Sequence, residues 1–445
     1  MATIFKRLRA QRFTGFLDTG VLNFSHINIF IGPNSAGKSS LLHIPLILKQ
    51  TFDDINPENR LITDGKLVGM GSFTDAIYGH DDKQSIGFDM TFGISHIARH
   101  LFMSSAVHRN GNVAPVPDGF AMEFGTTSRA KRTFIKSFKL HRDGKDIVEG
   151  TMSPSGKLKT WQSPLVSSVD RNVVVDFFHF APYASYRGRP TERILSEMRR
   201  FSLAMYDFRQ VCAAIFSSVV HLQPIRTPIR AADRLTGESP VSVGGTGENL
   251  LGVLYRDEKR GRSKRRLLSH LNYWLDKKFN LVKDVHIEPL TKSGSLFALT
   301  GKDSRSNIDI NLAAVGFGVS QVAPIIVQGF LSLPNTAIII EQPEIHLHPA
   351  AQAELGDLFI QLAEAEKQLF IETHSQYLLF RIQRRIAEGA LDAKKVRVFF
   401  VSRQETGSVV KQLELDERGR ILDWPAGFFE EGYTETAATA EALTK

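Results

Sequence analysis

A phosphate-binding loop near the start of this 445-residue chain is the first place where residue types and spacing imply chemistry. Residues 32–39 read GPNSAGKS and match the pattern G-x-x-x-x-G-K-[ST]. Backbone N–H groups of such a loop surround a polyphosphate, Lys38 neutralises the β- and γ-phosphates, and Ser39 binds Mg²⁺. We therefore expect ATP and Mg²⁺ here. The expected nucleotide contacts are Gly32, Pro33, Asn34, Ser35, Ala36, Gly37, Lys38, Ser39 and Ser40.

A second group of candidate residues follows two apolar stretches in the last third of the chain. Residues 338–344 read IIIEQPE, so Glu341 and Glu344 come just after a predicted buried strand. Carboxylates at the carboxyl end of such a strand can reach a metal-bound phosphate, and Glu341 is expected to bind Mg²⁺ together with Ser39. Residues 372–375, ETHS, follow the next predicted strand and include His374.

A pair of histidines and a basic run could each bind a ligand, but each also has an ordinary structural explanation. His346 and His348 form an H-x-H pattern that can bind zinc, but no cysteine or histidine cluster lies nearby, and a structural role is favoured. Residues 259–266 read KRGRSKRR and could contact nucleic-acid phosphates, although a basic run more often forms a solvated loop. The net charge of +8 permits a polyanionic partner without requiring one.

The elements that must position the loop are a strand and a helix. Residues 27–31 are apolar and run directly into Gly32, and residues 39–50 carry the apolar positions of a buried helix. After residue 337, strands and helices alternate, which predicts a parallel α/β sheet. Elsewhere we expect strands at residues 4–12, 21–24, 85–92, 134–140, 173–179, 396–402 and 409–415, and helices at 192–218 and 264–279.

Composition limits the class of protein. The single cysteine, Cys212, allows no internal disulfide and no multi-cysteine zinc site. The richest apolar stretch, residues 322–333, is interrupted by Pro324 and is too short for a membrane helix, and the first 13 residues do not resemble a secretory signal. A cytoplasmic location without a membrane partner is expected.

Together, the motifs resemble the head of an ABC-type ATPase of the SMC, RecF and OLD class. Residues 341–349 (EQPEIHLHP), 372–375 and 316–321 (GFGVSQ) are similar to compact ATPases related to OLD proteins, which are grouped with the AAA family. Many of those relatives serve bacterial anti-phage systems of the Septu, Gabija, PARIS and retron kinds. The resemblance covers roughly residues 1–80 and 310–430.

The resemblance implies a site shared between subunits. Gly316, Gly318 and Ser320 would form the signature segment, which contacts the γ-phosphate of a nucleotide held by a second subunit. We expect Ser320 to cap a helix whose first turn contains Pro324. His374 corresponds to the histidine that senses the γ-phosphate. The chain would form a homodimer or higher oligomer through its ATP sites.

One position departs from the common ABC pattern, in which a Walker B aspartate is followed at once by the glutamate that activates water. Here these positions are Glu341 and Gln342, and an amide is not a general base. Either Glu344 takes over this role, or hydrolysis is slow and ATP acts mainly as a clamp; slow hydrolysis is favoured. The glutamine of the family's Q-loop is not assigned to a residue here. Gln50 lies at the end of the first predicted helix, and residues 71–75, the more suitable region, contain no glutamine.

The fold class implied is an α/β ABC-type P-loop ATPase head with a mixed sheet. Its parts would be residues 1–80 and 311–402 of the head, an inserted α+β region at 81–310, and a C-terminal hairpin and aromatic element at 403–445. Residues 424–429 are either an aromatic plug on the sheet or a docking surface. Too few residues follow His374 for the TOPRIM nuclease domain of OLD nucleases.

We therefore expect an ATPase that regulates a separate effector, a nuclease or toxin, in bacterial anti-phage defence. The main alternative is a RecF-like repair ATPase that binds DNA through its basic segments. A transporter ATPase paired with membrane subunits is a third interpretation, and the motifs argue against it.

Overall fold

The computed structural model describes residues 3–54, 56, 60–94, 116–127, 132–163, 165, 173–234, 240–259, 266–292, 295–425 and 429. The chain divides into two compact units. The first unit comprises residues 1–24, 33–219 and 401–410, and the second comprises residues 25–32, 220–400 and 411–445. The chain therefore passes between the units several times.

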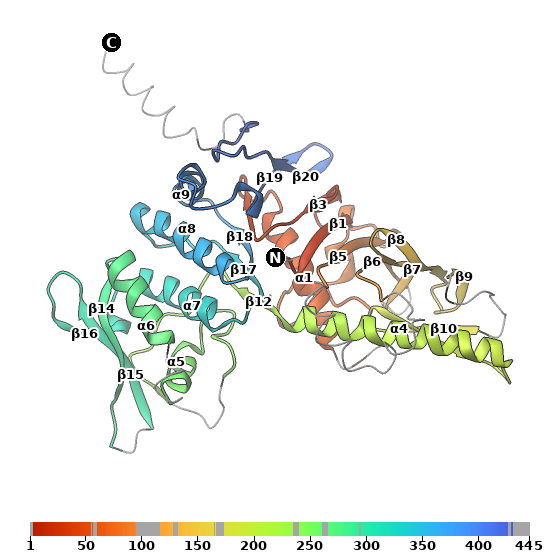
Figure 1. Ribbon diagram of the computed structural model, residues 1–445, viewed down its shortest axis with the longest axis horizontal. Coiled ribbons are helices and arrows are strands. Elements are labelled where there is room, and N and C mark those ends of the chain that lie inside the picture. The colour runs from red at the N-terminus through yellow and green to blue at the C-terminus, as the bar shows by residue number, and fades with distance from the viewer. Residues whose placement is uncertain are drawn as a thin grey trace, which may run out of the picture. The chain divides into compact units, whose positions relative to one another are not determined.

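The first unit is built on an eight-stranded sheet with the order β2-β1-β5-β6-β7-β8-β9, in which β3 also pairs with β1. Its pairings are antiparallel, and buried residues recur along β1, Phe5–Phe13, as in a sheet with one face on a core. Helix α4, Glu192–Ser217, packs against α1 and β11 (Figure 1). The other strands are β2 Phe16–Asp18, β3 Leu22–Asn23, β5 Ile86–Phe92, β6 Gly119–Thr126, β7 Thr133–Arg142, β8 Lys145–Met152, β9 Leu158–Gln162, β10 Val173–Phe178 and β11 Ala181–Tyr186.

The second unit is built on a six-stranded sheet with the order β12-β17-β18-β4-β19-β20. Strands β17, β18, β4 and β19 are parallel, whereas β20 follows β19 across a two-residue turn and must run antiparallel to it. All residues of β4, β17 and β18 are buried, as expected for central strands covered on both faces. The bounds are β12 Val219–Leu222, β17 Ala337–Glu341, β18 Gln368–Glu372, β4 Ile27–Ile31, β19 Val396–Gln404 and β20 Gly407–Leu413.

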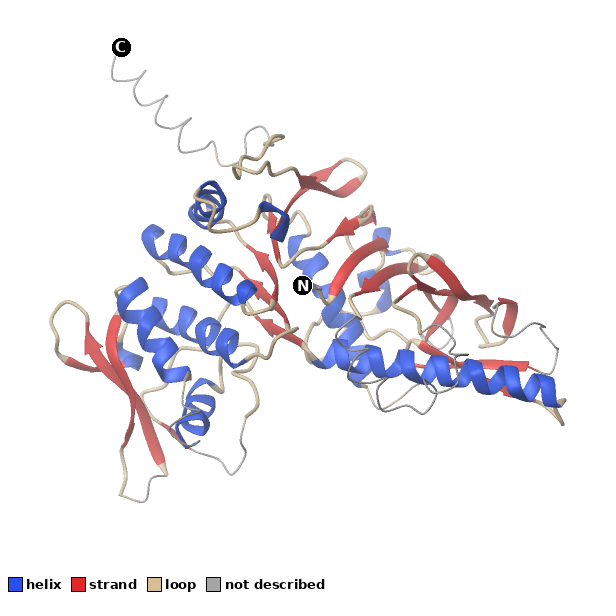
Figure 2. Ribbon diagram, in the orientation of Figure 1, coloured by secondary structure: helices blue, strands red, loops and turns tan. Residues whose placement is uncertain are grey.

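Helices α7 (Phe317–Leu331), α8 (Pro349–Glu364) and α9 (Gln376–Ala387) belong to the same unit, and α8 contacts both α7 and α9. In a smaller four-stranded sheet the long strand β15 pairs with β14, as Figure 2 shows, and also with the short strands β13 and β16. The remaining bounds are α5 Leu250–Lys259, α6 Leu267–Asn272, β13 Asp233–Arg234, β14 Val282–Pro289, β15 Leu296–Asp303 and β16 Asp309–Asn311.

The predicted α/β fold class with a mixed sheet is confirmed, and the predicted strands and helices form with small shifts at their ends. One helix differs: instead of a single α-helix over residues 264–279, the described part begins at Leu267 and continues from Tyr273 to Lys278 as a π-helix. Among the described residues, no helix combines the length and apolar character that crossing a membrane requires. The four-part division of the chain by motif remains a proposal.

Candidate functional site

The phosphate loop connects the buried strand β4 to helix α1, Lys38–Asp53. Gly37 has a φ of 103°, and a Cβ atom there would lie 2.8 Å from the ring of Phe16. Only glycine fits both conditions. The N-cap of α1 is Gly37, which has no side chain that could cap the helix, and the backbone N–H groups of a first helical turn point towards an anion bound at that end.

Within the loop, Lys38 is buried and Pro33, Asn34 and Ser35 are exposed. The Lys38 ammonium donates a hydrogen bond to the Pro33 carbonyl at 2.9 Å, which folds the side chain back over the loop. Ala36 is buried, while Ser39 and Ser40 are half-buried. These residues fit a magnesium–nucleotide, because they offer N–H donors and one ammonium to phosphate and a hydroxyl oxygen to a hard cation.

The register of the central sheet brings the predicted Walker B residue, Glu341, to the same sheet edge as Gly32, which directly follows β4. Glu341 pairs with Glu372 on β18, and Glu372 pairs with Phe30 on β4. The chain continues this row, since Gln342 N–H donates to the Glu372 carbonyl at 2.8 Å and Thr373 N–H donates to the Phe30 carbonyl at 3.1 Å. Because the strands are parallel, Gly32 and Gln342 leave the sheet at one carboxyl edge.

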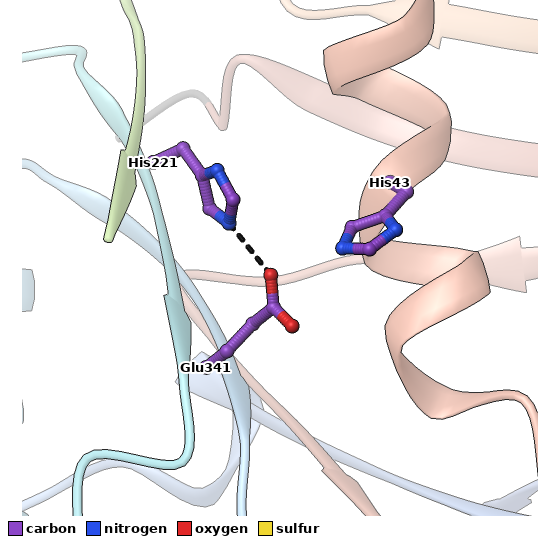
Figure 3. Close-up of side chains that lie close together, drawn as sticks. All are labelled: His43, His221 and Glu341. Carbon is purple, nitrogen blue, oxygen red and sulfur yellow. Dashed lines mark hydrogen bonds and ion pairs between the residues drawn. The ribbon is translucent and has the colours of Figure 1, made fainter. Parts of the chain in front are cut away.

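Glu341 is held at both its side chain and its backbone. The carboxylate lies 2.6 Å from Nε2 of His221, which comes from β12 (Figure 3). The backbone carbonyl accepts a hydrogen bond from the Arg226 guanidinium at 3.1 Å. Glu341 is only 5% exposed, so these contacts fix a nearly buried carboxylate.

Glu344 is also buried, and it lies beside the end of β18. Its Oε1 accepts a hydrogen bond from the backbone N–H of His374 at 2.6 Å, while Oε2 is buried and has no hydrogen-bond partner among the described residues. Burial raises the pKa of the Glu344 carboxyl, and the N–H groups of His374 and Glu344, the Thr373 hydroxyl and the charge of Arg226 oppose that rise. The structure thus brings the Glu344 carboxylate to the His374 backbone.

Gln342 takes a left-handed backbone conformation, with a φ of 43°. Such a conformation is unusual for a residue with a side chain and turns the chain sharply after β17. His374 is half-buried, and the next residue, Ser375, caps α9 through a hydrogen bond from Leu378 N–H at 3.2 Å.

The expectation that Ser320 caps the signature helix is wrong. Helix α7 begins at Phe317 with Gly316 as its N-cap, and Pro324 lies in the helix interior. Ser320 is 4% exposed, and its Oγ accepts a hydrogen bond from Ile229 N–H at 3.1 Å. This tertiary contact satisfies the hydroxyl that a cap would have used. Gly316 and Gly318 remain at the start of α7, where the exposed ring of Phe317 lies 5.5 Å from that of His346.

The two histidines of the H-x-H pattern have local roles. His348 caps α8, since its Nδ1 accepts a hydrogen bond from Ala350 N–H at 3.3 Å. His346 is exposed and has a φ of 62°. Within the described part of the chain, neither belongs to a cluster of three or more potential metal ligands.

Gln50, one candidate for the Q-loop, is committed to the structure of its own loop. Its Nε2 donates to the carbonyls of Ile62 and Val68, and its Oε1 accepts from the N–H groups of Leu67 and Val68. With both ends of the amide engaged, the side chain organises residues 61–68. This arrangement favours a structural role for Gln50.

Sequence reasoning missed three residues around Glu341: His221, Arg226 and Gln321. Arg226 stands in an arginine-rich stretch whose members usually face solvent, yet it is 1% exposed. Nothing in its local sequence distinguishes it, because its burial depends on contacts with α7 and β17 that lie far along the chain.

The basic run at residues 259–266 and the aromatic segment at residues 424–429 were the other two candidates from the sequence. Within the basic run, residues 260–265 lie outside the described residues. In the C-terminal element, Trp424 and Phe429 pack against the core of the second unit and border a cavity of about 390 Å³ with Phe380, Gln383, Arg420 and Ile421. That packing favours the aromatic plug.

Comparison with known proteins identifies an ATPase domain. Residues 257–379 match the family "AAA ATPase domain", and residues 391–438 match the family "Protein of unknown function (DUF3696)". No curated protein matches. The first match covers Glu341, Glu344 and His374 and extends over less than half of the chain, and it does not reach the phosphate loop at residues 32–39.

Solved structures with similar folds are heads of SMC proteins. A head bound to the C-terminal winged-helix domain of ScpA has 11% identity and a TM-score of 0.44, over 93% of this chain and 98% of that chain. A head from Thermotoga maritima has 12% identity and a TM-score of 0.40, over 93% of this chain and 100% of the other. A head derived from Pyrococcus furiosus, bound to the C-terminal domain of ScpA, has 11% identity and a TM-score of 0.42, with both chains fully covered.

Proposed function

We propose that this chain binds ATP with Mg²⁺, hydrolyses it slowly, and uses the nucleotide to assemble with further copies and regulate a separate effector, a nuclease or toxin, in bacterial anti-phage defence. The observation that carries the nucleotide part is the row from Glu341 through Glu372 to Phe30, which puts Walker B and the start of the phosphate loop at one sheet edge. The defence role is supported by the motif resemblance alone.

Each expected site residue has a role in this proposal. Lys38 and the loop backbone from Gly32 to Ser40 bind the phosphates, and Ser39 and Glu341 hold Mg²⁺. When bound, Mg²⁺ would neutralise the charge that develops on the phosphate oxygens. His374 senses the γ-phosphate, and Gly316 and Gly318 lie in the segment that approaches a second copy. Ser320, which is buried, holds that segment through its hydrogen bond with the Ile229 N–H.

Gln342 and Glu344 are the two candidates for the position that activates water. Slow hydrolysis follows from Gln342, because an amide at the usual base position does not accept a proton. Glu344 is the candidate base for the remaining turnover, because burial raises the pKa of its carboxyl and its Oε2 has no hydrogen-bond partner among the described residues. The RecF-like alternative depends on the basic run, of which residues 260–265 lie outside the described residues, so no contact of that run supports it.

The proposal predicts that Lys38→Ala abolishes ATP binding, because the loop loses the ammonium that neutralises the triphosphate. Titration calorimetry with ATP and Mg²⁺ on the wild type and the variant measures this directly. The same variant, expressed with the neighbouring genes, should lose protection in a phage plating assay. Wild-type ATP affinity in Lys38→Ala contradicts the nucleotide site; normal protection with abolished binding contradicts only the defence role.

A further inference from the structure

Arg226 is a fully buried cation beside the two candidate carboxylates. It follows β12 in the second unit and is 1% exposed. Burial lowers the pKa of its guanidinium to about 10, while the charges of Glu344 and Glu341 act in the opposite direction. The side chain therefore remains charged at neutral pH and supplies a counter-charge inside the unit.

The guanidinium joins two elements. One nitrogen, Nη2, donates to the backbone carbonyl of Glu341 at 3.1 Å, and Nη1 donates to Oε1 of Gln321 at 3.4 Å. Gln321 returns a hydrogen bond from its Nε2 to the backbone carbonyl of Arg226 at 3.4 Å. Since Gln321 lies near the start of α7 and Glu341 ends β17, one side chain connects the signature helix to Walker B.

The next residues strengthen this connection. The Ile229 N–H donates to Ser320 Oγ at 3.1 Å, so the segment that carries Arg226 is attached to two consecutive residues of α7. Both are nearly inaccessible, with Ser320 at 4% and Gln321 at 3% exposure. A displacement at the start of α7 must therefore move this segment or break its hydrogen bonds.

A buried arginine is a costly way to hold elements together. Removing a charged group from water is expensive, and among the described residues Nε of Arg226 has no hydrogen-bond partner. The hydrogen bonds of Arg226 are thus better explained by a mechanical link between α7 and Glu341 than by a gain in the free energy of unfolding.

We infer that Arg226 is a positioning residue that couples the signature helix to the catalytic carboxylates, so that a second copy docking on α7 sets the geometry of Glu341. This inference rests on the proposed ATPase function. It requires the planar fork of arginine, which reaches the Glu341 carbonyl and Gln321 at once; a lysine keeps the charge but has no such fork.

The test uses the full chain and compares Arg226→Lys with the wild type. We expect kcat to fall about 100-fold, as misplacement by about 1 Å can cause. The ATP dissociation constant and the midpoint of thermal unfolding should stay close to those of the wild type. The control is Arg230→Lys, on the same segment, where the arginine is largely exposed and paired with Asp233.

A second readout is specific to coupling. In the wild type, turnover per chain should rise with chain concentration as copies assemble. In Arg226→Lys, light scattering should still detect ATP-dependent assembly, but turnover per chain should no longer rise with it. A residue that only stabilises the fold would change the unfolding temperature without separating assembly from turnover.

Gln321→Met keeps the inference testable if Arg226→Lys fails to fold. It removes the other end of the link at similar volume, should lower kcat in the same way, and should add little to Arg226→Lys in the double variant. If Arg226→Lys folds and its kcat equals that of the wild type, the inference is overturned and the proposed function is not. If Arg226→Lys does not fold, a wild-type kcat in Gln321→Met has the same consequence. Failure of the wild type to bind ATP overturns the proposed function, and the inference with it.

Discussion

At the residue scale, Gln342 and Glu344 occupy different surroundings on the turn that follows β17. Gln342 is half-buried in a left-handed conformation. Glu344 is buried, with one oxygen accepting from the His374 N–H and the other without a hydrogen-bond partner in the part of the chain that the structure describes. In the common ABC pattern the residue directly after the Walker B carboxylate is the base, which here would be residue 342. The second carboxylate oxygen of Glu344 favours residue 344 instead.

Two substitutions separate these roles. Gln342→Glu should raise phosphate release, because general-base catalysis contributes about 10²- to 10⁴-fold and even a poorly aligned carboxylate adds part of that. Glu344→Gln should remove most of the residual turnover while ATP still binds, if Glu344 is the base. Steady-state phosphate release at matched protein and Mg²⁺ concentrations measures both. A fast wild-type rate that neither substitution changes would place the catalytic carboxylate elsewhere.

At the scale of elements, a charged cluster fixes α9 on α8. Asp357 accepts hydrogen bonds from Arg381 at 2.6 Å and from Nε and Nη2 of Arg385 at 2.6 and 2.7 Å. Burial raises the pKa of Asp357, but the Arg385 hydrogen bonds and the Arg381 charge outweigh it and hold that pKa below its usual value. The cluster should therefore stabilise the pair of helices that follow β17 and β18.

Asp357→Asn should destabilise the protein by about 2 kcal/mol, because two guanidinium groups lose their shared carboxylate. That loss lowers the unfolding midpoint by about 4–8 °C. A lowered pKa means that this stabilisation exists above the pKa of the unfolded chain and is lost as pH falls through the folded value. The difference in unfolding midpoint between the wild type and Asp357→Asn should thus become smaller as the pH falls.

Thermal unfolding followed at several pH values checks this prediction. The control is Glu388→Gln, whose exposed carboxylate pairs with Arg384 and Arg385 and should matter little. Equal effects of the two substitutions, or a gap that grows on acidification, would contradict the role given to Asp357.

Most elements could be predicted from the sequence because their signals are local. The five buried residues of β4, the glycines of the loop and the apolar face of α1 identify themselves by pattern. The start of α7 was misplaced because serine commonly caps helices, and only the distant Ile229 N–H shows where its hydroxyl is used. His221 and Arg226 were missed for the same reason: ordinary polar residues acquire their place through tertiary contacts.

At the scale of the whole molecule, the proposed composite site predicts complementation between two inactive variants. Lys38→Ala removes nucleotide binding, and Gly316→Arg should block docking, since a Cβ atom at Gly316 meets no atom within 4 Å and the fold can accept the side chain. If the two variants pair at random, half of the dimers contain one chain of each kind. In such a dimer one site combines the intact phosphate loop of Gly316→Arg with the intact signature segment of Lys38→Ala. Turnover should then recover to about a quarter of the wild-type value.

Phosphate release from each variant alone and from the mixture measures this recovery. Mixing Lys38→Ala with itself at double concentration controls for concentration. A mixture no more active than its components, together with no ATP-dependent change in light scattering, would show that sites are not shared between copies.

The place of β4 in the sheet has a consequence for biosynthesis. This central strand is separated from its neighbours by most of the intervening chain: Asn28 donates to the Leu369 carbonyl across 341 positions, and Ser25 donates to the Lys394 carbonyl across 369 positions. At about 5–20 residues per second, the ribosome needs roughly 20–70 s to synthesise the 341 positions between Asn28 and Leu369. During that time β4 has neither β18 nor β19 to pair with. The strand that leads into the phosphate loop thus gains its partners only after β18 and β19 have been synthesised, so a growing chain cannot assemble this part of the nucleotide site before then.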